Sequence, residues 1–225
     1  MPEWKSDQEL FGLIRGELFT AVVGDVCDEI GMRDRFLPPE IKPLGGRARG
    51  VMAGRAMPVL ELDLTPEHNN GEPFGRMFEA LDSLAADEVY LSAGSTQPYA
   101  LFGELMSIAA MKRGAAGVVC HGNVRDTEKI LELVFPVFCH GSYALDQKGR
   151  GTVLDYRVAV SVAGLWIRPG DILVGDTDGV ISVPREAEEE IFSLALAKAR
   201  TETSIKSALE AGMSASKAFQ SFGMF

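Results

Sequence analysis

Residues 102–126 read FGELMSIAAMKRGAAGVVCHGNVRD. They predict a helix that Gly114 closes, an apolar strand over 116–121, and a turn that places Arg125 directly beside Asp126. A strand over 88–94 precedes this segment, and a further helix and strand follow it to Cys139. Because strands that alternate with helices pair in parallel through right-handed crossovers, the pattern predicts an α/β core.

The flanks of this core have other patterns. Apolar residues at helical spacing predict helices over 6–31, with Ser6 as N-cap, Glu9 completing a capping box and a restart at Thr20. Residues 47–62 predict short strands separated by small residues, and 65–75 predict a loop. We expect one domain over 1–225, with a helical N-terminal segment (6–31), an α/β core (47–184) and a helical tail (185–225).

Composition excludes several classes of protein. The net charge of −10 argues against nucleic acid as a partner, because phosphate binding needs a basic surface. Three cysteines without a CxxC pair argue against a disulfide framework or a cysteine zinc site. The N-terminus is polar and no apolar run reaches ~18 residues, so we expect no signal peptide, no membrane span and a cytoplasmic location.

Two predicted loops lie where ligands bind in a parallel sheet, beyond the carboxyl ends of the strands. The first leads to Gly103 and Glu104 at a helix start, and the second leads to Arg125 and Asp126 at another. Helix-start amides bind carboxylates, and arginine pairs with them through two hydrogen bonds. Carboxylates such as Asp126 and Glu104 are ligands for Mg²⁺ or Mn²⁺. These residues predict a site for a metal ion and a small organic anion.

A simpler interpretation fits the same residues. Asp126 is also suited to cap the following helix, and Glu104 is also an ordinary first-turn acid favoured by the helix dipole. Gly103 and Gly122 shift the balance toward a site, because they permit close approach of the backbone. Spacing alone leaves both interpretations open.

The order of these residues resembles the signature of the RraA-like family, which includes the class II 4-hydroxy-4-methyl-2-oxoglutarate aldolases. That signature is an acid, twenty residues, and then Arg-Asp. Here it comprises Glu104, residues 105–124, Arg125 and Asp126. The aldolases usually have aspartate at the first position, so Glu104 is a departure. Residues 20–31 and 168–184 resemble further parts of the family, so the likeness extends over most of the chain.

The resemblance implies a fold and an activity. The fold is a swivelling β/β/α domain, similar to phosphohistidine domains, that assembles as homotrimers or hexamers with active sites between subunits. The activity is divalent-metal-dependent cleavage of 4-hydroxy-2-oxo acids to pyruvate, with oxaloacetate decarboxylation through the same enolate.

The resemblance also implies residue roles. Asp126 would bind Mg²⁺ or Mn²⁺ directly, Arg125 would contact the pyruvyl portion, and Glu104 would orient a water used in proton transfer. Backbone near Gly103, Leu105 and Met106 would receive the substrate carboxylate. A neighbouring subunit would add an acid, for which the candidates are Asp25, Asp28, Glu29 and the acids of EAEEE (186–190).

Other functions remain as alternatives. The family includes regulators that bind an RNA-processing enzyme, and a lyase or dehydratase for another hydroxy acid could use the same site. A methyltransferase is disfavoured because no glycine-rich nucleotide loop is present. A Schiff-base aldolase is disfavoured because Lys112 and Lys129 lie on predicted exposed helix faces. His121 and His140 both follow apolar strands, while Arg47, Arg49 and Arg55 suit a solvated strand face better than an anion site.

Overall fold

The computed structural model describes residues 2–65 and 74–223, with four parallel strands at its centre. They are β2 (Met52–Asp63), β4 (Glu88–Ala93), β6 (Gly117–Cys120) and β8 (Val137–Cys139), in the spatial order β8-β6-β4-β2. Helices α3 (Met77–Asp82), α4 (Glu104–Lys112) and α5 (Thr127–Glu132) precede β4, β6 and β8 in the chain. The predicted α/β alternation is confirmed.

Strand β2 corrects one prediction. Residues 52–63 form one strand of 12 residues, where the sequence predicted short separate strands. One edge of β2 pairs with β4, and the other pairs first with β13 (Ile172–Gly175) and then with β10 (Gly151–Tyr156). Pro58 lies between the stretches of β2 that pair with β13 and with β10. No strand pairs with that edge of β2 at Pro58, so the sheet loses no hydrogen bond through the missing N–H. Gly54 accepts a close neighbour, because a Cβ there would lie 2.4 Å from the carbonyl oxygen of Asp87.

The remaining strands complete the sheet and add two small ones. Strand β14 (Val180–Val183) forms a hairpin with β13, while β1 (Lys42–Pro43) and β3 (Phe74–Gly75) pair with β8 and β10. Strands β11 (Val160–Val162) and β12 (Leu165–Ile167) pair with each other. Strands β5 (Ala100–Phe102), β7 (Asn123–Val124) and β9 (Gly141–Ser142) follow β4, β6 and β8 and form a parallel sheet of their own. This small sheet aligns the loops at the carboxyl ends of the central strands.

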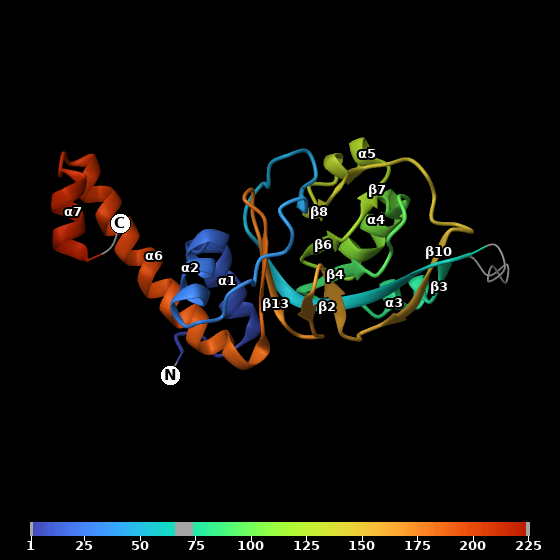
Figure 1. The fold of residues 1–225 in the computed structure, drawn as a ribbon, viewed down its shortest axis with the longest axis horizontal. Helices are drawn as coiled ribbons and strands as arrows, with labels where there is room; N and C mark the ends of the chain where they lie inside the picture. Colours follow the sequence, from blue (N-terminus) through green and yellow to red (C-terminus); the bar gives the residue numbers. More distant parts are fainter. Residues whose placement is uncertain (1, 66–73, 224–225) are drawn as a thin grey trace.

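The N- and C-terminal helices pack on β13 and β14, beyond that end of the sheet. Helices α1 (Asp7–Glu17) and α2 (Thr20–Glu29) lie beside the start of α6 (Glu188–Glu210), which follows the short helix η2 (Arg185–Ala187) (Figure 1). Helix α7 (Ala215–Phe222) packs on the far end of α6, remote from the sheet. Ser6 caps α1 as predicted, but the Glu9 carboxylate accepts from the N–H of Lys5 at 2.6 Å, so the capping box is incomplete.

Apolar side chains fill both faces of the sheet. On one face, a first cluster joins α1, α2 and α6 to β13 and β14, and a second joins α3–α5 to β2, β4 and β6. On the other face, a third cluster joins β2, β4, β6 and β13 to β11 and β12. Cys27, Cys120 and Cys139 are free and buried. None of the helices within residues 2–65 and 74–223 has the length and apolar character of a membrane span.

Arg55 does not lie on a solvated strand face, contrary to prediction. Its guanidinium group binds the Asp7 carboxylate at 2.6 and 2.8 Å, the Glu188 carboxylate, and the carbonyl oxygen of Gly170 at 3.0 Å. Only 14% of its side chain is exposed. Arg55 thereby ties β2 to both flanking helical segments.

We expect Arg55→Met to lower the free energy of unfolding by about 3 kcal/mol, because two acids lose a largely buried partner. Urea denaturation would measure the loss. Arg113→Met is the matched control, since Arg113 and its partner Asp82 are both largely exposed and such a pair contributes ~0–1 kcal/mol. Equal losses in the two variants would contradict the role given to Arg55.

Candidate active site

A cavity of about 290 Å³ lies between α3, α4 and the small sheet that carries β5 and β7. Five predicted site residues line it, and the sixth, Glu104, is partly exposed at its edge. Apolar side chains from α3 and α4 form much of the wall. The lining residues from the prediction are Gly103, Leu105, Met106, Arg125 and Asp126.

Pairing of β5 with β7 brings the two predicted loops together. Phe102 is in register with Val124, and the N–H of Arg125 donates to the carbonyl oxygen of Phe102 at 3.0 Å. The start of α4 therefore lies against the Arg125–Asp126 turn, as neighbouring parallel strands predicted.

Asp126 precedes α5 but does not cap it through its side chain. Its backbone is left-handed, with φ 56° and ψ 34°, a conformation that aspartate tolerates better than most residues. Its Oδ2 atom instead accepts from the N–H of Glu104 at 3.2 Å, at the start of α4. A Cβ on Gly103 would lie 2.8 Å from that oxygen. Asp126 is therefore the N-cap of α5 by position, as the simpler interpretation predicted, but its side chain bonds to α4 instead of its own helix.

Arg125 is held between two acids. Its Nη1 atom lies 3.3 Å from Oδ1 of Asp146, and its Nε atom lies 3.8 Å from Oδ2 of Asp126. The Arg125 side chain is 40% exposed, so it stays open to a ligand. Asp146 and its neighbour Gln147 also line the cavity, and neither was predicted. Asp146 follows Asp126 by twenty residues, and no local pattern marks either Asp146 or Gln147.

The first turn of α4 offers free amide groups. Gly103 is the N-cap and supplies no side-chain acceptor, and the first N–H groups of a helix lack partners within it. The N–H of Glu104 is occupied by Asp126, while those of Leu105 and Met106 remain beside the cavity. A carboxylate bound there would lie close to Arg125.

The donor atoms suit a hard, largely hydrated cation. Within the described residues, no three histidine, cysteine or acidic side chains form a metal-binding cluster. Asp126 is 43% exposed and bonds through one carboxylate oxygen in the described chain, so its other oxygen is free to bind a cation. Mg²⁺ commonly uses one or two protein carboxylates and keeps several waters, so the residues fit that ion.

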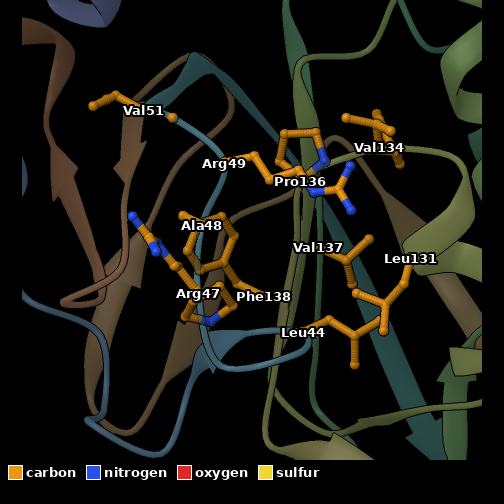
Figure 2. A pocket seen from close by; sticks show the side chains of 13 residues that line it. Leu44, Arg47, Ala48, Arg49, Val51, Leu131, Val134, Pro136, Val137 and Phe138 are labelled. Carbon is orange, nitrogen blue, oxygen red and sulfur yellow. The ribbon is translucent and has the colours of Figure 1, made fainter. Parts of the chain in front are cut away.

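Other predicted candidates lie elsewhere. The rings of His121 and His140 meet edge to face, 5.1 Å apart, which confirms that they share a sheet edge. Arg47 and Arg49 border a separate, mostly apolar pocket, and in Figure 2 their guanidinium groups point in different directions. His68 lies outside the described residues.

The acids proposed for a neighbouring subunit do not line the cavity of their own chain. Asp25 and Glu29 pair with Lys198, and Glu188 pairs with Arg55. A contribution from a second copy therefore stays a prediction. Lys112 and Lys129 are exposed, as expected.

Comparison with known proteins identifies the family of this chain. A family model described as RraA-like, Aldolase/RraA, matches residues 20–182. The chain belongs to the RraA-like family. The 4-hydroxy-4-methyl-2-oxoglutarate aldolase of Thermus thermophilus is 31% identical over 153 residues, which cover 66% of this chain and 84% of that protein.

Two further proteins are similar to this chain. Protein DlpA of Legionella pneumophila is 28% identical over 204 residues, which cover 90% of this chain but only 32% of DlpA, so the chain spans about a third of that relative. The crystal structure of Streptomyces coelicolor RraAS2, described as an unusual member of the RNase ES inhibitor RraA family, superimposes with a TM-score of 0.76. It shares 22% identity and covers 88% of this chain and 97% of its own. That likeness confirms the predicted RraA-like fold with flanking helices.

Proposed function

We propose that this protein is a divalent-metal-dependent lyase that cleaves 4-hydroxy-2-oxo acids, of the 4-hydroxy-4-methyl-2-oxoglutarate type, to pyruvate. The observation that carries the proposal is the meeting of Arg125, Asp126 and the free amides of α4 in one cavity. The name of the Thermus thermophilus relative supports the same chemistry. Oxaloacetate decarboxylation passes through the same enolate, so we propose that activity as well.

Asp126 would hold the Mg²⁺ or Mn²⁺ ion. The bound ion would supply Lewis-acid polarisation of the substrate's 2-oxo group. The amides of Leu105 and Met106 would bind the C1 carboxylate, which fixes the substrate at the helix start. Arg125 lies beside Asp126 and the start of α4, and it would stabilise negative charge as this develops on the 2-oxo oxygen.

The bond changes then balance. A base takes the proton of the C4 hydroxyl. The C3–C4 bond then breaks, its electron pair stays with C3 to form the pyruvate enolate, and C4 becomes the carbonyl carbon of the second product. In oxaloacetate the same bond breaks with loss of CO₂. The pyruvate enolate takes a proton at C3, and we propose that Glu104, at the edge of the cavity, orients the water that delivers it.

The surroundings of the cavity support an oligomer. Leu105 and Phe78 line it and are 78% and 59% exposed. Exposed apolar side chains that gather at one place mark an interaction surface, so we propose that a second copy packs here, as in the predicted homotrimer. Three buried free thiols support a reducing compartment, such as the cytoplasm.

Pyruvate release tests the function. Oxaloacetate and 4-hydroxy-4-methyl-2-oxoglutarate are supplied with Mg²⁺ or Mn²⁺, and parallel reactions contain EDTA. We expect metal-dependent turnover well above that of free metal. No turnover on either substrate would overturn the proposal and favour the alternative of a non-catalytic regulator, which the description of the RraAS2 family supports.

Gly103→Ala separates site geometry from stability. The backbone of Gly103 is extended, a conformation that alanine also adopts, so we expect a stability change below ~1 kcal/mol. The new methyl group must displace the Asp126 carboxylate, so we expect pyruvate release to fall by about 100-fold, as positioning defects commonly cause. Gly12→Ala is the control, since nothing lies within 4 Å of a Cβ there. Unchanged turnover in Gly103→Ala would argue against the Asp126 position described above.

A further inference from the structure

A buried acid lies behind the cavity wall. Glu61, near the end of β2, is only 2% exposed. The side-chain N–H of Gln147 donates to the Oε2 atom of Glu61 at 2.5 Å, and the Oε1 atom of Glu61 has no hydrogen-bond partner among the described residues. Such a group is costly to bury, so its retention calls for a reason.

The partner of Glu61 belongs to the proposed site. Gln147 is 3% exposed and lines the same cavity as Arg125 and Asp126. The residue before it, Asp146, lies 3.3 Å from the Arg125 guanidinium group. The Glu61–Gln147 bond therefore fastens the segment that orients Arg125, across 86 positions of sequence.

Among residues 2–65 and 74–223, no cation faces Glu61 from the elements packed around it. The titratable groups that act on it or feel its charge are Asp63 on β2, Tyr90 on β4, Tyr99 before β5 and Cys120 on β6. The hydroxyl group of Tyr90 is also buried, with no hydrogen-bond partner in the part of the chain that the structure describes. Burial raises the pKa of Glu61 to about 8, so the carboxyl group is mostly uncharged at neutral pH. An uncharged Glu61 therefore acts by holding Gln147 through a hydrogen bond, and not by balancing a charge.

We propose that Glu61 is a positioning residue, which holds the Gln147 amide against the cavity and keeps Asp146 beside Arg125. Gln147 spends one N–H on Glu61 and retains its second N–H and its carbonyl oxygen for a bound substrate. Gln147 is then a substrate contact, and Glu61 acts through it. This inference rests on the proposed function, since it assigns a role within the same site.

Oxalate binding tests the proposal without requiring turnover. Oxalate is a planar anion of the same shape and charge distribution as the pyruvate enolate, and calorimetric titration in the presence of Mg²⁺ measures its affinity. We expect Glu61→Leu to weaken oxalate binding at least tenfold, because Gln147 loses its anchor. Glu61→Gln should remain within threefold of the parent protein, because an amide oxygen still accepts from Gln147.

Two controls distinguish positioning from a loss of folding. Met57→Leu alters an equally buried residue on the same strand and should leave the affinity unchanged. The double variant Glu61→Leu, Gln147→Leu should bind oxalate no more weakly than Gln147→Leu alone, because the two residues act as one unit. Partial misfolding lowers the number of binding sites per chain but does not change the dissociation constant. One titration therefore distinguishes misfolding from weaker binding.

Each outcome decides the proposal. Normal affinity in Glu61→Leu, equal losses in Glu61→Leu and Glu61→Gln, additive losses in the double variant, or no oxalate binding by the parent protein would overturn it. If the parent protein binds oxalate and the variants behave as expected while oxaloacetate yields no pyruvate, the lyase function fails and the positioning role stands.

Discussion

Asp126→Asn is expected to lower metal-dependent pyruvate release about a thousandfold, because the amide keeps the size of the side chain but loses the charge that would hold the cation. The fold should be unaffected, since asparagine also tolerates the left-handed backbone at this position. Its amide oxygen can still accept from the N–H of Glu104. Steady-state kinetics on oxaloacetate with Mg²⁺ or Mn²⁺ would measure the loss.

Two companion variants sharpen that experiment. Asp82→Asn removes an exposed acid that pairs with Arg113, away from the cavity, and should retain full activity. Arg125→Lys keeps a positive charge but loses the planar fork that pairs with Asp146 and would bind the proposed substrate, so we expect a loss of about 100-fold. Turnover by Asp126→Asn within tenfold of the parent protein would exclude Asp126 as the metal ligand.

Glu61→Gln is expected to change how stability depends on pH. The folded protein binds the Glu61 proton up to a pKa of about 8, whereas an unfolded glutamate releases it near 4.5. Between these values the unfolded state binds fewer protons, so the contribution of Glu61 to the free energy of unfolding falls as pH rises. Each pH unit corresponds to ~1.4 kcal/mol, so the whole interval is worth about 5 kcal/mol.

In Glu61→Gln, the fall in the free energy of unfolding with rising pH that Glu61 causes should disappear. We expect Glu61→Gln to be more stable than the parent protein at pH 8, and the advantage should shrink as pH falls toward 5, as measured by urea unfolding at a series of pH values. Asp63→Asn is the control of opposite sign. Hydrogen bonds from Thr96, Tyr99 and Ser95 lower the pKa of Asp63, so its contribution is lost at acidic pH. Parallel stability curves for Glu61→Gln and the parent protein would show that Glu61 is ionised when buried.

Local pattern predicted the centre of the fold well. Strands and helices between 88 and 139 carry their own periodicity and turn residues, so their type and order followed from sequence. The continuity of β2 did not, because Gly54 and Pro58 are local strand breakers. Their effect is overcome by neighbours distant in sequence, namely β4, β10 and β13.

The site divides in the same way. Arg125 and Asp126 follow a predicted strand, so topology alone placed them near the start of α4. No local pattern predicted Asp146, Gln147 or Glu61, because each contacts a partner far away in the sequence. The direction of the Asp126 side chain was also beyond sequence reasoning, since a left-handed backbone turns it from its own helix toward α4.

The pairing of β2 has a consequence for synthesis on the ribosome. Its outer edge needs β10 and β13, which are translated roughly 90 to 120 residues later, or about 5 to 20 s at ordinary elongation rates. During that interval a nascent chain carries a 12-residue, mostly apolar segment with an open edge. Contacts between distant segments also form slowly because their loop entropy must be overcome first. A newly made chain therefore exposes an unpaired strand edge until β13 has been made.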